Sequence, residues 1–237
     1  MADLLRDGTI DPWTAAHIWA ALARRQSLSV IGGQSGIGKT TLLTALCELL
    51  PPETRRVYIR GCYEDFAFLR DPRIDPRHTA LMVNELSPHL PVYLWGPGVA
   101  EVFEATRQGF MVLATAHAQS ALEFVGSLTG GPLRLPPTLV AAIAVVVGLG
   151  IDPETSRRRA TGVWRLQKTR RGISVDRLAS SPHQRERATS ADEWFPAPEI
   201  DTRARLLAEL MTGSGPLPHA LGILAVHNHD CVGDGAP

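Results

Sequence analysis

The feature that most constrains this chain is a glycine-rich loop between a short apolar segment and a helical one. Residues 28–32 (LSVIG) predict a buried strand, residues 33–40 (GQSGIGKT) form the loop, and residues 39–50 predict a helix that Pro51 and Pro52 end. The loop fits the pattern GxxxxGK[ST] in the strand–loop–helix context that the pattern needs. Its glycines let successive backbone N–H groups face phosphate oxygens, and the positive end of the helix faces the same point. The loop therefore predicts a nucleotide phosphate site.

Two side chains of this loop have the expected chemistry. Lys39 is expected to neutralise the β- and γ-phosphates, and the Thr40 hydroxyl to bind Mg²⁺. Of the 24 basic residues only Lys39 and Lys168 are lysines, and a compact ammonium suits a phosphate cradle better than a planar guanidinium. ATP and Mg²⁺ are the expected cofactors, with Thr40 as the metal ligand. The predicted nucleotide-binding residues are Gly33, Gln34, Ser35, Gly36, Ile37, Gly38, Lys39, Thr40 and Thr41.

Composition limits the class of protein. The chain of 237 residues is 44% hydrophobic, enough for a packed core, and its 24 basic and 24 acidic residues cancel, so its charge gives no case for nucleic acid or an anionic membrane. The longest apolar run, residues 139–151, is shorter than the ~20 residues that span a bilayer. Three cysteines without zinc or CxxC spacing, and no signal peptide, predict a cytoplasmic chain with no direct membrane insertion.

The remaining pattern predicts an α/β fold, because apolar strands alternate with helices along a mostly parallel sheet. Expected strands lie at residues 28–32, 56–60, 92–95 and 111–116. Expected helices lie at residues 11–25, with Asp11 as N-cap, and at 39–50, 99–108 and 120–128. Residues 79–86 are a possible helix, residues 139–149 fit helix or strand, and residues 160–168 and 172–177 predict a hairpin.

The predicted domain boundary lies near residue 180. Residues 1–180 form the expected nucleotide-binding domain, and the pattern degrades after Ser180. Residues 181–237 are an expected extension with one helix near residues 201–211 and then a flexible, poorly structured tail. The tail contains His227-Asn228-His229-Asp230-Cys231, which resembles a metal-binding tract but has no second ligand group at zinc spacing.

Three stretches resemble the traffic ATPases of type II and type IV secretion, type IV pilus assembly and archaeal flagella. Residues 28–46 are similar to the family's strand, Walker A loop and helix, and residues 108–120 (QGFMVLATAHAQS) to its histidine box. Residues 139–178 resemble the hairpin that closes the family's catalytic domain. The resemblance implies a RecA-like P-loop NTPase core that forms a homo-oligomer, usually a hexamer. It also implies a cytoplasmic motor, peripheral to the inner face of the membrane, on a membrane platform protein.

The resemblance also implies catalytic residues. His117 matches the second histidine of the box and would sense the γ-phosphate or the ring neighbour, whereas Phe110 replaces the first. Glu64 falls on the last acid of the family's Asp box and is a candidate to polarise the attacking water, although a solvated loop carboxylate is an equal alternative. Glu101 falls on the acid of a later Glu-Thr pair.

One expected acid is missing from this alignment. The family's third strand ends in Gly-Glu, but residues 92–98 (VYLWGPG) end without an acid, which would spare nucleotide binding and suppress hydrolysis. Two functions therefore remain: an ATPase that drives pilus assembly or secretion, and a catalytically weak or inactive ATP-binding subunit of such a machine. A small-molecule P-loop kinase is a weaker third, since it gives the His117 box no role.

Several arginines stay unassigned. The resemblance implies an arginine finger in this interval, but the residue spacing does not show whether it is Arg70, Arg73 or Arg77. The basic stretches at residues 157–159 and 170–171 could bind phosphate or nucleic acid, but such stretches are more often solvated or form contacts between subunits.

Overall fold

A computed structural model describes residues 1–178 and 194–212, which form two compact units. The sheet unit consists of residues 26–43 and 53–177, and the helical unit contains residues 1–25 and 44–52 together with Leu178 and the described residues from Trp194 onward. The expected flexible tail and the tract at His227–Cys231 lie outside the described residues.

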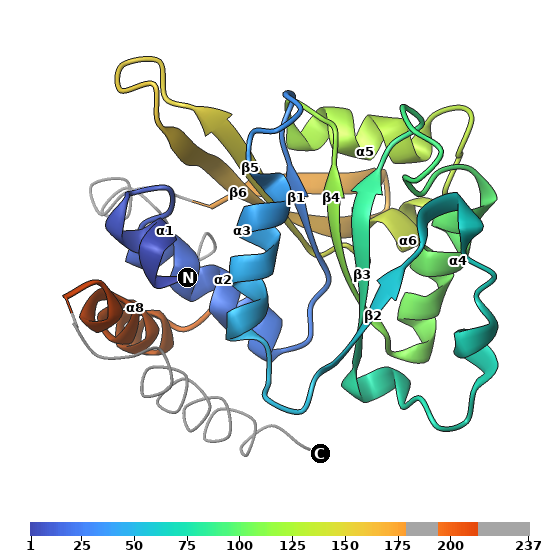
Figure 1. Cartoon of the computed structure of the whole chain (residues 1–237), viewed down its shortest axis with the longest axis horizontal. Helices are drawn as coiled ribbons and strands as arrows, with labels where there is room; N and C mark the ends of the chain where they lie inside the picture. The colour runs from blue at the N-terminus through green and yellow to red at the C-terminus, as the bar shows by residue number, and fades with distance from the viewer. Residues whose placement is uncertain (179–193, 213–237) are drawn as a thin grey trace. The chain divides into compact units, whose positions relative to one another are not determined.

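Seven strands in the order β2-β3-β4-β1-β5-β6-β7 build the sheet unit (Figure 1). The first five in this order run parallel, and β6 and β7 continue the sheet as an antiparallel hairpin. This confirms the predicted α/β fold with a mostly parallel sheet and a late hairpin. The strands are β1 (Leu28–Ile31), β2 (Arg55–Ile59), β3 (Thr79–Leu86), β4 (Met111–Ala116), β5 (Val145–Ile151), β6 (Arg158–Thr169) and β7 (Gly172–Arg177).

Three helices of the sheet unit bury apolar side chains against strands of the sheet. They are α4 (Pro97–Ala105), α5 (Ala121–Thr129) and α6 (Pro137–Val140), and their core residues include Val102, Phe103, Phe124 and Leu139. Ser120 caps α5, since its side chain accepts a hydrogen bond of 3.1 Å from the Glu123 N–H. The 3-10 turns of this unit are η2 (Gly61–Tyr63), η3 (Ala67–Arg70), η4 (Pro76–His78) and η5 (Thr106–Gln108).

Two expected elements were wrong. Residues 79–86 form strand β3, between β2 and β4, and not a helix. Residues 92–95 make only one bridge, between Leu86 and Leu94, and not a strand. A parallel strand buried on both faces presents a continuous apolar run, which the sequence does not distinguish from a short buried helix. The ambiguous residues 139–149 divide between α6 and β5.

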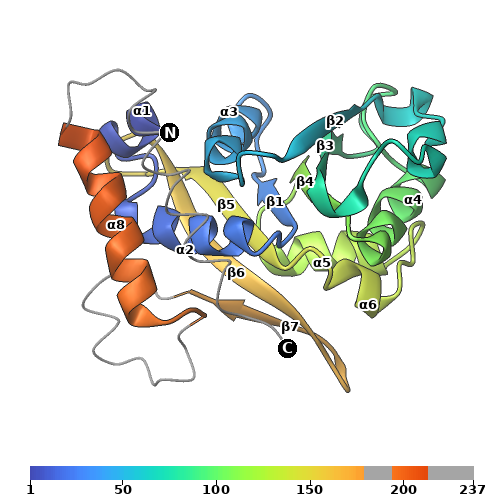
Figure 2. The same cartoon turned by 90° about the horizontal axis from the view of Figure 1, so that it is seen from below.

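The helical unit contains α1 (Ala2–Arg6), α2 (Pro12–Ala23), η1 (Cys47–Leu49) and α8 (Ala197–Thr212), which includes the helix expected at 201–211. As predicted, Asp11 caps α2, accepting from the Thr14 N–H at 2.9 Å. Helix α8 runs beside α1 and α2 (Figure 2), and its fully buried Arg203 lies 4.3 Å from the ring centre of Trp19. Helix α3 (Lys39–Leu46) starts in the sheet unit. No helix in the described part of the chain is long and apolar enough to cross a membrane.

Candidate functional site

The carboxyl ends of β1, β3 and β4 meet at one level of the sheet. Ile31 and Leu86 both pair with Ala116, so the residues that follow β1 and β4, and the last residues of β3, lie near one another. The glycine-rich loop leaves β1 at this edge, and α3 begins at Lys39. In parallel α/β sheets this edge is where ligands bind.

The loop has the backbone that its glycines predict. Gly36 and Gly38 have φ values of +73° and +105°, in the left-handed region that favours glycine. A Cβ built on Gly36 would meet no heavy atom within 4 Å, so the loop is open at this point. Lys39, which is only 7% exposed, points back across the loop, with Nζ 3.5 Å from the Gln34 carbonyl oxygen. The backbone of the loop and the direction of its lysine thus agree with the motif, and phosphate binding there stays a prediction.

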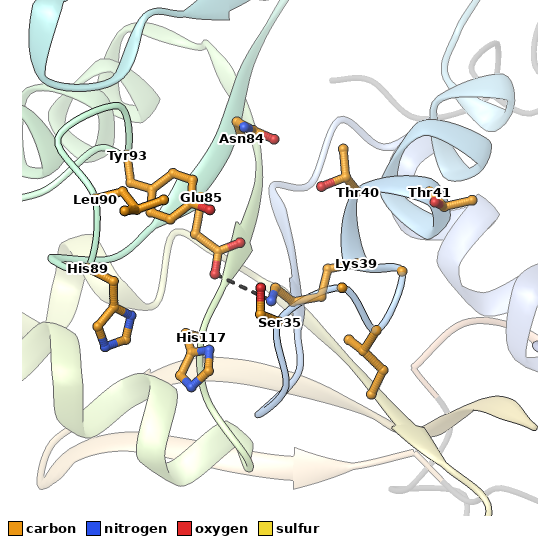
Figure 3. A pocket seen from close by; sticks show the side chains of 13 residues that line it. Ser35, Lys39, Thr40, Thr41, Asn84, Glu85, His89, Leu90, Tyr93 and His117 are labelled. Atoms are coloured by element: carbon orange, nitrogen blue, oxygen red, sulfur yellow. Dashed lines mark ion pairs between the residues drawn. The ribbon is translucent and has the colours of Figure 1, made fainter. Parts of the chain in front are cut away.

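A cavity of about 500 Å³ lies in front of this loop (Figure 3). One wall consists of Ser35 through Thr41, the other of residues from the end of β3, the following segment and the end of β4. In the close-up, Glu85, His89 and His117 lie on the side of Lys39 away from Thr40 and Thr41. The residues that line the cavity opposite the loop are Asn84, Glu85, His89, Leu90, Tyr93 and His117.

Glu85 is the acid that the sequence reasoning missed. Its Oε1 lies 3.4 Å from the Lys39 Nζ, and both side chains are largely buried, with 12% and 7% exposed. The pairing of β3 with β4 shifts between Val83 and Leu86, which is a β-bulge, and such a bulge re-aims a side chain near the end of a strand. The expectation of a strand end without an acid is therefore corrected, because it placed the strand at 92–95 instead of 79–86.

A buried threonine holds Glu85 in place. The Thr115 hydroxyl, on the neighbouring strand β4, donates to the Glu85 Oε2 at 2.9 Å and also contacts the Asn84 carbonyl oxygen. Thr115 itself is fully buried. Glu85 is thus fixed from two sides, with one oxygen on Thr115 and the other facing Lys39.

Two histidines share the same cavity. His117 follows β4, as the sequence predicts, and its ring lies edge-on to that of His89 with centroids 5.1 Å apart. His89 was not predicted, and it lies within hydrogen-bond distance of Ser87, 2.7 Å from Oγ to Nδ1. The loop after β3 has no regular pattern, so only its place next to the Asn-Glu strand end could have indicated His89.

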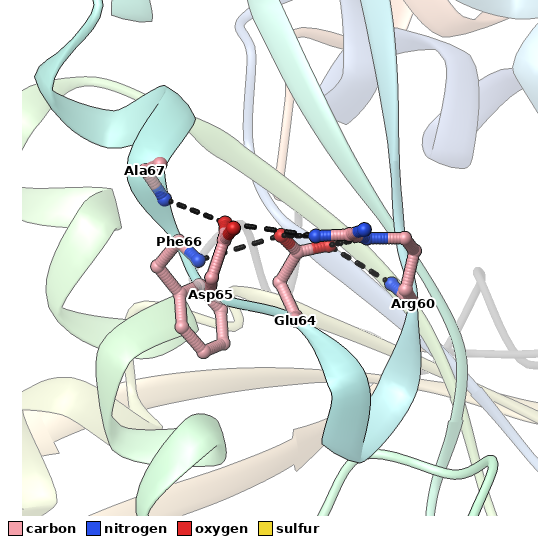
Figure 4. Close-up of polar contacts among 5 residues, drawn as sticks. All are labelled: Arg60, Glu64, Asp65, Phe66 and Ala67. Carbon is pink, nitrogen blue, oxygen red and sulfur yellow. Dashed lines mark hydrogen bonds and ion pairs between the residues drawn. The ribbon is translucent and has the colours of Figure 1, made fainter.

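The structure does not bring Glu64 to the cavity. Both of its carboxylate oxygens accept hydrogen bonds, from Arg60 and from the Phe66 N–H (Figure 4). Burial raises the pKa of Glu64, but the hydrogen bonds and charge of Arg60 outweigh it, so the pKa lies below its ordinary value. Glu101 is exposed on α4 and does not line the cavity either. Catalytic roles for Glu64 and Glu101 stay predictions.

Among the arginines singled out from the sequence, Arg73 pairs with Asp71 at 2.7 Å. Within the described part of the chain Arg158 contacts the loop, because its Nη2 lies 3.4 Å from the Gly36 carbonyl oxygen. Arg159 pairs with Asp152 at 2.9 Å.

The donor set of the cavity fits Mg²⁺. Thr40, Asn84 and Glu85 supply hydroxyl, amide and carboxylate oxygens, the hard ligands that this ion prefers. Within residues 1–178 and 194–212 no three His, Cys, Asp or Glu side chains gather as a metal cage.

Comparison with known proteins gives partial matches. No family model matches the chain. The uncharacterized protein MJ1287 of Methanocaldococcus jannaschii is 26% identical over 160 residues, covering 61% of this chain and 59% of the relative. MJ0900 of the same organism is 24% identical over 171 residues, covering 62% of this chain and 29% of the relative. The chain thus spans less than two thirds of the length of either relative.

Among solved structures, the chain is similar to the VirB11 ATPase of the Brucella suis type IV secretion system, determined in complex with sulphate. The TM-score is 0.46 with 21% sequence identity over 62% of this chain and 50% of that one. Any assignment of function therefore depends on the geometry of the cavity itself.

Proposed function

We propose that this protein binds ATP with Mg²⁺ and hydrolyses it in the cavity between the loop and Glu85. The observation that carries the proposal is the distance of 3.4 Å between the Lys39 ammonium and the Glu85 carboxylate. In this proposal Lys39 is the phosphate-binding cation and Glu85 the general base for the same γ-phosphate. A Lys39 that moves to phosphate oxygens leaves the Oε1 of Glu85 free to accept a proton from water.

Each residue then has a defined task. The loop N–H groups and Lys39 hold the β- and γ-phosphates, and Thr115 keeps Glu85 aimed at the cavity. Mg²⁺, bound near Thr40 and the end of β3, would offset phosphate charge. His117, which lines the cavity next to His89, would contact the γ-phosphate. Positioned proton transfer by Glu85 is worth roughly 10²–10⁴ in rate.

Phosphate release by the purified chain tests this proposal. Wild type is expected to release phosphate in the presence of Mg²⁺, Lys39→Ala to lose ATP binding, and Glu85→Gln to retain binding with release at least about 100-fold slower. Glu104→Gln, a partly exposed carboxylate on α4 outside the cavity, is the matched control and is expected to behave as wild type. ATP binding by the wild type without any release would contradict hydrolysis and leave a nucleotide-binding subunit.

We propose further that turnover drives pilus assembly or protein secretion, by a homo-oligomer docked on a membrane platform protein. This role is supported by the resemblance of residues 108–120 to the traffic ATPase histidine box and by the position of His117 in the cavity. Light scattering of Glu85→Gln with MgATP tests the assembly: a hexamer is expected, and a monomer at all nucleotide concentrations would contradict it.

A further inference from the structure

In the proposed function the cavity holds the phosphates of a nucleotide. A different part of the sheet unit is available for the nucleoside end. We propose that Arg158 and Ile151 form the nucleoside subsite, in which a purine base stacks on the Arg158 guanidinium. This inference rests on the proposed nucleotide binding and extends it to the base.

The strand order sets the direction in which a nucleotide lies. Strand β1, which leads into the loop, lies between β4 and β5. Glu85 and His117 are at the ends of β3 and β4, so the γ-phosphate is expected on that side of the loop. The opposite end of the triphosphate then leaves toward β5, which flanks β1 on its other side, and toward β6 beyond it.

Strand β5 extends past the end of β1 on this side. Ile31 pairs with Gly148, and β5 continues for three more residues to Ile151. Leu149 Cδ2 lies 3.8 Å from where a Cβ on Gly38 would stand, so this face of β5 borders the loop. Ile151 lies two residues further along the same face, because side chains alternate in a strand. It is one of the few large apolar side chains in the described structure that are strongly exposed, at 49%.

Arg158 joins Ile151 on that face. The two residues pair directly across β5 and β6, which places their side chains side by side. The Arg158 Nη2 donates to the Gly36 carbonyl oxygen at 3.4 Å, and its Cδ and Nη1 lie 3.6 Å from a Cβ built on Gly38. The guanidinium is thus tied to the rim of the phosphate loop.

The remaining surface of this guanidinium suits an aromatic ring. In the described residues no carboxylate pairs with Arg158, whereas the adjacent Arg159 is held by Asp152. A planar, weakly hydrated guanidinium stacks on aromatic faces, and the exposed Ile151 adds apolar area next to it. Neither side chain reads the hydrogen-bonding edge of a base, so ATP and GTP are expected to bind alike, and both more tightly than CTP or UTP.

Titration calorimetry with two ligands tests the subsite, using MgATP and Mg²⁺ with inorganic tripolyphosphate, which has no nucleoside. Arg158→Ala is expected to weaken MgATP about ten-fold and tripolyphosphate less than two-fold. Ile151→Ser is expected to weaken ATP alone, by a few-fold. The matched control is Arg157→Ala, an exposed arginine one position earlier, which is expected to change neither affinity.

Other results of this titration would overturn either the nucleoside subsite or the nucleotide binding on which it rests. Equal losses for ATP and tripolyphosphate in Arg158→Ala would make Arg158 a brace of the phosphate loop and overturn the subsite, and so would unchanged affinities in both variants. Wild type that binds tripolyphosphate and ATP equally well would overturn the nucleoside subsite alone. Wild type that binds neither ligand would overturn the proposed nucleotide binding itself.

Discussion

Replacing Thr115 by valine removes one hydroxyl and keeps the shape of a fully buried side chain. The lost hydrogen bond to the Glu85 Oε2 is 2.9 Å long and has a charged acceptor. Such bonds contribute about 1.5–3 kcal/mol, and the lower end applies because the Thr115 hydroxyl also contacts the Asn84 carbonyl oxygen. About 1.5 kcal/mol corresponds to a roughly ten-fold lower kcat. The KM for ATP is expected to stay near that of wild type, because the phosphate loop is untouched.

Steady-state phosphate release at varied MgATP measures both constants. The matched control is Thr106→Val, which removes a hydroxyl bonded to the Phe103 carbonyl oxygen at 2.6 Å, beyond the end of α4. Its kcat is expected to equal that of wild type. A Thr115→Val protein with unchanged kcat, or with only a raised KM, would refute the idea that Thr115 aims Glu85.

Two further predictions concern stability. Gly61→Ala is expected to lower the free energy of unfolding in a urea titration by more than about 2 kcal/mol. The reason is that Gly61 has φ +62° and that an added Cβ would overlap the Val92 carbonyl. Gly126→Ala, in an open position on α5, is the control and should not destabilise the protein. The Arg24 guanidinium bonds Glu199 and lowers its pKa, outweighing the effect of burial, so this pair is expected to stabilise the fold above about pH 4.5 and to lose that effect as pH falls through the lowered pKa. Glu199→Gln should remove about 1 kcal/mol at pH 7 and flatten this pH dependence, whereas a parallel acid transition in both proteins would contradict it.

The loop and its surroundings were predictable because their signals are local. The motif around Lys39, the cap residue Asp11 and the final hairpin each depend on residues close together in the chain, and the structure has them where they were expected. Phosphate cradles and caps use fixed spacings of a few residues, so sequence alone indicates them.

Glu85 escaped prediction because its signal is tertiary. Residues 79–86 (TALMVNEL) contain good helix formers and no alternation, and only pairing with β2 and β4 makes them a strand. Residues 92–95 (VYLW) have the stronger strand composition, yet Val92 is 55% exposed there. The composition of each segment indicates how well its residues suit a strand. Whether the segment joins the sheet depends on pairing with strands that are distant in sequence.

Arg158 escaped for a similar reason. The sequence marks three adjacent arginines, and only the antiparallel register of β5 and β6 places Arg158 opposite Ile151 and beside the loop. Register is set by the pairing of whole strands and not by the residues of one strand.

The central claim is that Glu85, and not Glu64, is the base for ATP hydrolysis. The most direct measurement is the rate of phosphate release at saturating MgATP for Glu85→Gln and Glu64→Gln, each with ATP binding checked in parallel. Glu85→Gln is expected to lose at least about 100-fold in release with binding retained, and Glu64→Gln is expected to release phosphate at nearly the wild-type rate. Full activity in Glu85→Gln together with loss in Glu64→Gln would contradict it.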